Sequence, residues 1–203
     1  DSINYAENIQ NAILPSINAI EQDLGDSFVL FRPRDIVSGD FYWYASLNNK
    51  VFIAACDCTG HGVPGAFVSM TGNNLLNQII LEKKEENPGK ILTQLNQGVK
   101  SAFTKGGEQG AQDGMDMVLS VLDKKNNCLE YAGANNSMIF IRNGKLEVLK
   151  GDRTSIGGDT EWDFEFQSKT IETVENDRFY MFSDGYQDQF GGVKGKKFMI
   201  KRY

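Results

Sequence analysis

The stretch "KVFIAACDCTGHGVPGAFVSM", residues 50–70, leads from an apolar, strand-like run through a glycine-rich turn into a helical pattern. The apolar run ends at Asp57, and glycines flank His61, the only histidine in the chain. From Pro64 onward, apolar residues recur at helical spacing. Two interpretations follow: the turn holds a metal and a phosphate, or it is only a tight connection between a buried strand and a helix.

Predicted strands precede and follow this stretch. Asn48-Asn49 predicts a hairpin turn between two of the long ones. Later in the chain, turn signals separate short strands in the pattern of an antiparallel meander. In order, the predicted strands are "SFVLFRP" (27–33), "GDFYWYASLNN" (39–49), "KVFIAACDCTG" (50–60), "MVLSVLD" (117–123), "CLEYAGA" (128–134), "SMIFIRN" (137–143), "KLEVLK" (145–150), "EFQSKTIETV" (165–174) and "DRFYMFSDG" (177–185).

Two consecutive helices are predicted between the early and the late strands. They cover residues 64–85 and 89–104, and a glycine-rich loop, "GGEQGAQDG" (106–114), follows them. Strands, two helices and then strands predict an α+β fold, with antiparallel sheet and a helical hairpin on one face. Alternating βα units are absent, which argues against a doubly wound parallel sheet.

The composition limits the classes of protein to which the chain belongs. Its 203 residues, 40% hydrophobic and 24% charged, suit one domain with a sizeable core. The formal net charge is -6 and no basic stripe is present, so nucleic acid is not an expected partner. Apolar runs such as "VFIAAC" are far too short to span a membrane, and the polar, acidic N-terminus is no signal peptide.

The three cysteines, Cys56, Cys58 and Cys128, are not spaced as a zinc-binding pair. Unpaired thiols favour a reducing compartment. We therefore expect a cytoplasmic location, either free or as the cytoplasmic part of a larger or membrane-tethered sensor. Because the sequence does not begin with Met, the chain is expected to be a fragment of a longer protein.

The N-terminal segment carries apolar residues at helical spacing: Ile3, Ala6, Ile9 (or Gln10) and Ile13, with Pro15 as a stop. Residues 1–16 are therefore predicted as a linker helix in front of a domain of residues 17–203. A single apolar stripe needs a surface to cover it. The helix either packs on its own domain, or belongs to a signalling linker or coiled coil that pairs with a second copy of the chain.

Three aspartates occupy the ends of predicted strands. "VFIAAC" runs into Asp57, "FYMFS" runs into Asp184, and Asp40 begins an aromatic strand after Ser38-Gly39. Strand ends are rigid, which suits carboxylates that must converge on a cation. Asp oxygens without clustered His or thiolate ligands select hard ions such as Mg²⁺ or Mn²⁺. The alternative for each residue is a turn-forming Asp.

The segments "SGDFYW" (38–43), "DCTGHGVPGAFVSM" (57–70) and "FSDGYQDQ" (182–189) resemble, in order, the motifs of SpoIIE/RsbU-type serine phosphatases. These belong to the metal-dependent, type 2C-like protein phosphatase superfamily. "YAENIQNAILPS" (5–16) also resembles the linker helix that often precedes the domain. The resemblance implies antiparallel sheets packed as a sandwich and flanked by helices, with a two-metal centre at one edge.

The resemblance also implies roles for individual residues. Asp57 would bridge two Mn²⁺ or Mg²⁺ ions, with the Cys58 backbone carbonyl as a neighbouring ligand. Asp40 would bind directly or through water, and Asp184 would complete the shell of the first ion. A metal-activated hydroxide would attack a phosphoserine or phosphothreonine in line, without a covalent enzyme intermediate. Family members usually carry a further Asp near the C-terminus that this sequence lacks, so the C-terminal part is expected to be missing.

Other polar residues each have two interpretations. His61 is a general acid or a loop residue, and "TGHGVPG" lacks the Lys and the βαβ context of a nucleotide-binding loop. Charged residues either meet the substrate phosphate or an outer metal shell, or are solvated and in loops: Arg32, Arg34, Asp113, Asp116 and Asp188. Three aromatic residues are predicted in the core or sheet: Phe41, Tyr42 and Trp43.

The function predicted from these features is that of a metal-dependent protein serine/threonine phosphatase domain. Its substrate would be a phosphorylated regulatory protein, such as an anti-sigma-factor antagonist, and its regulator an upstream sensor or linker domain in the same chain. The alternative is a non-catalytic, phosphatase-like signalling module with an incomplete metal site. A phosphotransferase with a covalent aspartyl intermediate would need a parallel sheet and later Lys and Thr or Ser motifs, which are not found.

Overall fold

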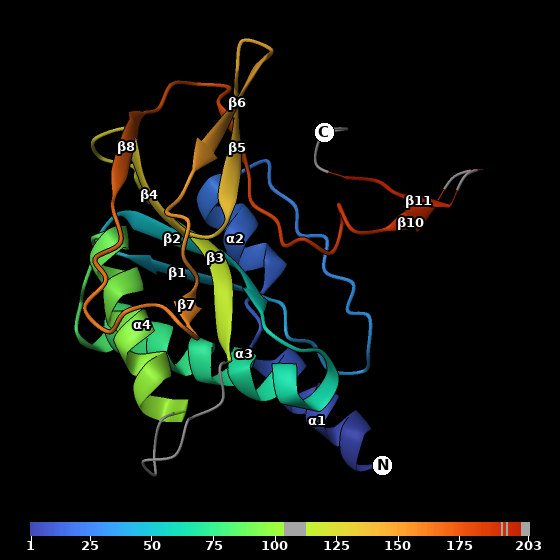
Figure 1. Ribbon diagram of the computed structural model, residues 1–203. Helices are drawn as coiled ribbons and strands as arrows, with labels where there is room; N and C mark the ends of the chain where they lie inside the picture. The colour runs from blue at the N-terminus through green and yellow to red at the C-terminus, as the bar shows by residue number, and fades with distance from the viewer. Residues whose placement is uncertain (104–112, 192, 194, 200–203) are drawn as a thin grey trace.

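Three layers make up the structure, a computed structural model that describes residues 1–103, 113–191, 193 and 195–199 (Figure 1). Two helices form the first layer, an antiparallel sheet the second and a smaller antiparallel sheet the third. The predicted α+β fold is confirmed. The predicted loop at residues 106–114 falls mostly outside the described residues.

The central sheet has the strand order β1-β2-β3-β4-β8, and β7 pairs with the first two residues of β3, Gly114 and Met115. All of these pairs are antiparallel, and the β1–β2 hairpin turns at Asn48-Asn49 with positive φ, as predicted. The strands are β1 (Phe41–Leu47), β2 (Lys50–Cys58), β3 (Gly114–Asp123), β4 (Cys128–Ala134), β7 (Ile156–Gly157) and β8 (Lys169–Glu172).

The helical layer covers one face of this sheet. It consists of α3 (Gly62–Leu76), which continues as the π-helical segment η1 (Asn77–Glu82), and α4 (Pro88–Phe103). The two predicted helices are thus confirmed, apart from the π-helical turns. Fully buried apolar side chains from both helices and the sheet form the main core, among them Phe52, Leu76, Ile80, Leu92, Leu95 and Met117.

The second sheet, with the order β6-β5-β9, packs on the opposite face of the central sheet. Its strands are β5 (Ser137–Arg142), β6 (Lys145–Lys150) and β9 (Arg178–Tyr180). The predicted meander is therefore wrong at one point. The chain changes sheets between β4 and β5, at Asn135-Asn136, where Asn135 has a φ of 49° that bends the backbone out of strand geometry.

The predicted strand at residues 27–33 is also wrong, because no strand forms there. A strand needs a hydrogen-bonded neighbour, and no described residues pair with this segment. Its side chains Phe28 and Leu30 are 72% and 66% exposed. Apolar alternation predicted the strand but could not supply a partner for it.

The N-terminal helix is confirmed as α1 (Ser2–Ile13), and a helix that the sequence analysis missed, α2 (Ile17–Leu24), follows it. α1 lies against α3 (Figure 1). Its buried residue is the polar Gln10, whereas Ile9 is 41% exposed. Of the two residues that fit the stripe, the amide and not the isoleucine faces the domain.

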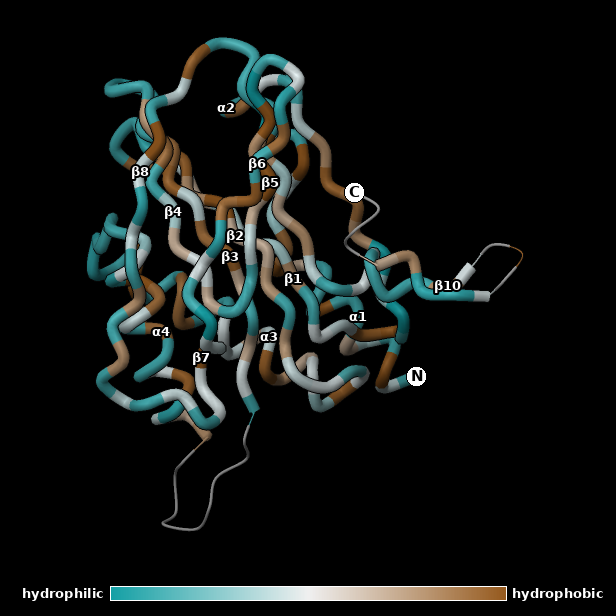
Figure 2. Tube along the Cα trace, turned by 45° about the horizontal axis from the view of Figure 1, so that its top comes forward, coloured by the Kyte–Doolittle hydropathy of each residue, from teal (hydrophilic) through white to brown (hydrophobic). Residues whose placement is uncertain are grey.

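Hydrophobic segments gather where the layers meet, and the loops are mostly hydrophilic (Figure 2). A short hairpin, β10 (Phe190–Gly191) and β11 (Lys196–Lys197), projects away from the three layers (Figure 1). In the described part of the chain, no helix is both long and apolar enough to cross a membrane.

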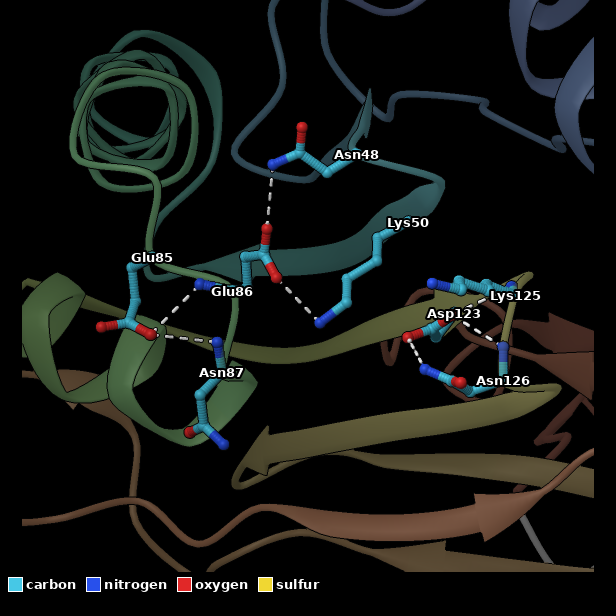
Figure 3. Close-up of polar contacts among 8 residues, drawn as sticks. All are labelled: Asn48, Lys50, Glu85, Glu86, Asn87, Asp123, Lys125 and Asn126. Carbon is cyan, nitrogen blue, oxygen red and sulfur yellow. Dashed lines mark hydrogen bonds and ion pairs between the residues drawn. The ribbon is translucent and has the colours of Figure 1, made fainter.

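A polar network ties the β1–β2 turn to the connection between the helices (Figure 3). Glu86 accepts a hydrogen bond from the Asn48 amide at 3.2 Å and pairs with Lys50 at 2.8 Å. The Glu85 carboxylate accepts hydrogen bonds from the backbone N–H groups of Glu86 and Asn87, at 3.1 and 3.0 Å. This end of the sheet is therefore held by matched charges and satisfied donors.

Candidate metal centre

The opposite end of β2 carries Asp57 between two other aspartates. In the β1–β2 register Phe41 faces Cys56, so Asp40, one residue before β1, comes opposite Asp57. In the β2–β3 register, Asp57 faces Asp116. Residues directly opposite in an antiparallel pair project to the same side, with Cβ atoms roughly 5 Å apart. Three carboxylates are therefore brought to one side of the sheet by register alone.

The loop after β9 closes over two of these carboxylates. The backbone N–H of Asp184 donates to Asp57 Oδ2 at 3.0 Å, and the Ser183 hydroxyl donates to Asp40 Oδ2 at 2.6 Å. The structure thus brings together Asp40, Asp57 and Asp184, as the sequence predicted. Whether they bind metal stays a prediction.

Burial and crowding of the acidic groups in this cluster raise the pKa values of Asp57 and Asp40. Burial is the largest cause that raises the pKa of Asp57, to about 7; the neighbouring charges of Asp40 and Asp184 act in the same sense, and the hydrogen bond from the Asp184 backbone acts against them. Burial also raises the pKa of Asp40, with the charge of Asp184 acting in the same sense and the Ser183 hydrogen bond against it. Among the described residues, no Lys or Arg side chain forms an ion pair with these three aspartates.

The backbone carbonyl of Cys58 lies beside Gly39, the residue before Asp40; that this carbonyl binds a metal stays a prediction. A Cβ atom on Gly39 would lie 3.2 Å from the Cys58 carbonyl oxygen and 2.7 Å from that of Gly60. Only glycine allows these carbonyls to approach the segment that carries Asp40. Burial raises the pKa of the Cys58 thiol well above its usual value, so the sulfur stays protonated and is a poor metal ligand.

The donors present fit a hard divalent cation. They are carboxylate and carbonyl oxygens; Asp40 and Asp57 are half-buried, Asp184 is exposed, and no Lys or Arg in the described part of the chain pairs with them. In the described residues, no three His, Cys, Asp or Glu side chains are grouped so that they could hold an ion by themselves. Mg²⁺ usually retains several waters and takes only one or two protein carboxylates, so Asp40 and Asp57 are compatible with it. The described residues therefore do not form a metal site that is closed by side chains alone.

The loop interpretation of Asp116 is wrong, because this residue lies within β3. Both of its carboxylate oxygens accept hydrogen bonds, from the Ser155 hydroxyl at 2.5 Å and from the Asn135 amide at 2.7 Å. Asp113 lies close by, with a long contact of 3.4 Å from the Thr59 hydroxyl. Asp116 therefore links Asp57 to the segments that carry Asn135 and Ser155.

The other candidates lie outside the cluster. Asp188 pairs with Lys197 at 2.6 Å on the β10–β11 hairpin. His61 precedes the first residue of α3, with its side chain 72% exposed and its Nδ1 2.9 Å from Asp35. Arg32 and Arg34 are exposed, which favours the solvated interpretation. His61 is accordingly placed as a loop residue and not beside the carboxylates.

The predicted aromatic residues belong to the sheet. Phe41 and Trp43 are buried in the main core, and the Trp43 indole N–H donates to Asn77 Oδ1 at 3.0 Å. The Tyr42 hydroxyl donates to the Pro15 carbonyl at 3.1 Å. The prediction of core or sheet aromatics is confirmed.

Sequence analysis missed the contact between α1 and the cluster. The Gln10 amide nitrogen donates to the Ser38 carbonyl at 2.6 Å and to the Ser69 hydroxyl at 3.0 Å, and its oxygen accepts from the Ser38 N–H at 2.8 Å. Ser38 lies two residues before Asp40, and Ser69 lies on α3. The one available signal was a Gln at a position where an apolar stripe was expected.

Comparison with known proteins gives one family and several structural relatives. The family model described as Stage II sporulation protein E (SpoIIE) matches residues 48–201. The phosphoserine phosphatase RsbP of Bacillus subtilis is 24% identical over 189 residues, which are 92% of this chain and 45% of that protein. The chain thus spans less than half the length of this curated relative.

Among solved structures, the SiaA-PP2C domain of Pseudomonas aeruginosa superimposes with a TM-score of 0.86 at 33% identity, covering 100% of this chain and 78% of that one. The RsbU and RsbW domains of Rv1364c from Mycobacterium tuberculosis give 0.62 at 17% identity, over 78% of this chain and 43% of that one. RsbX, solved in complex with magnesium, gives 0.58 at 15% identity, over 74% and 68%. The last two show a shared fold.

Proposed function

The chain belongs to the SpoIIE family, and on that premise we propose that it is a metal-dependent protein serine/threonine phosphatase domain. The observation that carries the proposal is the arrangement of Asp40 and Asp57 on facing positions of two strands, with the Asp184 loop bonded over them. Half-buried, crowded carboxylates that no Lys or Arg of the described residues pairs with are stabilised by an external positive charge. The bound metal ions of a metal-dependent hydrolase would supply this positive charge.

Two Mn²⁺ or Mg²⁺ ions would supply a water of lowered pKa and positive charge for the phosphoryl oxygens. Asp57, at the centre of the cluster, would face both ions, and Asp40, Asp184 and the Cys58 carbonyl would each face one. Similarity to a structure described as RsbX in complex with magnesium supports the choice of a hard ion. The Asp184 N–H fixes the Asp57 carboxylate in place.

The reaction is hydrolysis of a phosphate monoester. The water oxygen bonds to phosphorus, the bond from phosphorus to the Ser or Thr oxygen breaks, and that oxygen takes up a proton. His61 is not assigned as the proton donor, because its ring is mostly exposed and pairs with Asp35. Solvent reaches the leaving oxygen in an open site and can supply the proton.

The substrate we propose is a phosphoserine or phosphothreonine on a regulatory signalling protein, such as an anti-sigma-factor antagonist. The relative RsbP, named a phosphoserine phosphatase, supports the residue type. We further propose that residues 17–203 form the phosphatase domain in the cytoplasm, and that residues 1–16 form a linker helix to an upstream sensor. The packing of α1 on α3 supports a regulatory role for this helix.

A hydrolysis assay tests the proposal. Phosphoserine peptides are incubated with the protein in Mn²⁺, in Mg²⁺ and in EDTA, and released phosphate is measured. We expect turnover in either metal and none in EDTA, with thermal stability raised by the metal. Asp26→Asn, at an exposed aspartate that forms no hydrogen bond or ion pair with any described residue, is the matched control for substitution of the clustered aspartates. Metal stabilisation without phosphate release would favour the non-catalytic signalling module instead.

A further inference from the structure

A polar groove runs along the edge of the candidate metal centre. It consists of two hollows of about 420 and about 250 Å³ that share Asn135 and Arg153 in their walls. The larger is in the size range of small-ligand sites. Its wall includes Thr59, two residues beyond Asp57, and the hydroxyl side chains of Ser155 and Thr160.

The groove is joined to the carboxylate cluster through Asp116. This residue faces Asp57 across the β2–β3 pair, and it accepts hydrogen bonds from Ser155 and Asn135, which both line the groove. The Asn136 amide donates to the Phe182 carbonyl at 2.8 Å, next to the loop of Asp184. A molecule whose phosphate lies at the cluster can therefore extend directly into the groove.

The outer wall, residues 153–160, is held rigidly by α4. The buried amide of Asn96 accepts a hydrogen bond from the Gly157 N–H at 2.8 Å, and Lys100 Nζ donates to the carbonyls of Gly158 and Thr160 at 2.8 and 2.6 Å. A wall fixed in this way loses little freedom when a ligand binds, so its contacts contribute more of their energy to affinity.

Arg153 projects from this wall as an exposed cation. In the part of the chain that the structure describes, its guanidinium has no recorded hydrogen bond or ion pair, although the chain carries a net charge of -6. The neighbouring carboxylate of Asp152 accepts a hydrogen bond from the backbone N–H of Gln167 at 2.9 Å. A fixed groove with an unused guanidinium matches an anionic group on a ligand.

We propose that this groove binds the polypeptide beside the phosphorylated residue of the substrate, and that Arg153 selects an acidic side chain there. The proposal rests on the phosphatase function proposed above. Asp116, which accepts a hydrogen bond from Ser155, faces Asp57 at roughly 5 Å between Cβ atoms. Arg153 is two residues from Ser155, or roughly 7 Å farther along an extended chain, so the distance from the cluster is roughly 12 Å. A substrate strand advances about 3.3 Å per residue, so the acidic residue lies within about four positions of the phosphoserine.

Matched phosphoserine peptides test this inference. One set carries glutamates on the N-terminal or the C-terminal flank, and the other carries glutamines at the same positions. Binding is measured by fluorescence anisotropy in Mn²⁺, with labelled peptides that carry a non-hydrolysable phosphonate in place of the phosphate, and kcat and KM are then measured with the phosphoserine peptides. The protein variants are Arg153→Gln, Arg153→Lys and, as a matched control, Arg178→Gln, an exposed arginine at the start of β9 that pairs with Ile141 of β5.

We expect one glutamate-flanked peptide to bind about fivefold more tightly than its glutamine counterpart, a magnitude typical of an exposed ion pair, and the preference to shrink in high salt. Arg153→Gln should abolish the preference, Arg153→Lys should retain part of it, and Arg178→Gln should leave it unchanged. Equal binding of both sets, or a preference that survives Arg153→Gln, would overturn the inference. Failure to release phosphate in Mn²⁺ would overturn the proposed function, and the binding result with the phosphonate peptides would still decide the inference.

Discussion

The two ends of the β2–β3 pair carry charges in opposite arrangements. At one end Lys50 faces Asp123, and Lys50 also pairs with Glu86 at 2.8 Å (Figure 3). At the other end Asp57 faces Asp116, with Asp40 beyond it on the β1 side. The same two strands therefore place opposite charges face to face at one end and like charges at the other.

The pKa directions follow this difference. The hydrogen bond and charge of Lys50 lower the pKa of Glu86, and hydrogen bonds from Asn126 and Lys125 lower that of Asp123. Burial and neighbouring acids raise the pKa of Asp57 to about 7. Stability alone would favour the first arrangement at both ends. The like charges at the Asp57 end lower the free energy of unfolding, and a bound cation would offset this loss.

The largest expected effect comes from Asp57→Asn. The amide keeps the shape of the side chain but removes the central negative charge, so metal-dependent hydrolysis should fall on the order of a thousandfold. The metal-free variant should unfold at a higher temperature than the native sequence, because fewer acids repel one another. Phosphate release and calorimetry measure the two effects. An active variant, or one less stable without metal, would contradict the comparison.

Much of this site could be predicted from the sequence, because it depends on strand ends. The apolar run that stops at Asp57 places this residue at the end of β2, as predicted, whereas the predicted strand 177–185 is shorter: β9 ends at Tyr180, and Asp184 lies in the loop beyond it. The hairpin turn at Asn48-Asn49 then fixes the register that brings Asp40 opposite Asp57. These features are local, and local pattern determines them.

The missed features depend on distant partners. The buried Gln10 is satisfied by groups 28 and 59 residues away, and nothing near it in sequence indicates them. The change of sheet at Asn135 depends on a left-handed backbone that Asn tolerates but does not require. Residues 27–33 alternate like a strand, yet strand formation needs a neighbour that periodicity cannot reveal.

The second prediction concerns Gln10, which connects α1 to the acidic end. Gln10→Ala leaves the buried Ser38 N–H without a partner and its C=O with only the Ser69 hydroxyl at 3.2 Å, and should lower the free energy of unfolding by about 2 kcal/mol. Because Ser38 precedes Asp40 by two residues, the Mn²⁺ concentration for half-maximal stabilisation should also rise. Gln22→Ala, on the exposed side of α2, serves as the control. An unchanged metal response would show that α1 only anchors the chain.

The third prediction is a pH dependence of the metal-free protein. Unfolded Asp57 loses its proton near pH 3.8, whereas the folded carboxyl keeps it up to about pH 7. The folded state therefore binds more protons in this window, and its stability should fall as the pH rises from about 4 to about 7. After allowance for solvent screening, we expect a loss of about 2 kcal/mol.

Chemical denaturation in EDTA across this pH range measures the slope, and Asp57→Asn should flatten it. Above pH 7, where the carboxylates are ionised, saturating Mn²⁺ should restore the stability that the metal-free protein has lost, because the cation favours the ionised form. A slope that is identical in Asp57→Asn would assign the effect to other groups.

The smallest effect is expected at the balanced end, from Glu86→Gln. The amide can still accept from Asn48, so the change removes mainly the charge opposite Lys50, and should cost about 0.5 kcal/mol, less in high salt. The sign of its pH dependence is opposite to that of Asp57. Because the folded pKa of Glu86 is lowered, its contribution is present above pH 4.5 and is lost as the pH falls through the folded value. A double-mutant cycle with Lys50→Met isolates the pair. A coupling as large as the Asp57 effect would mean that the two ends of the strands do not differ in kind.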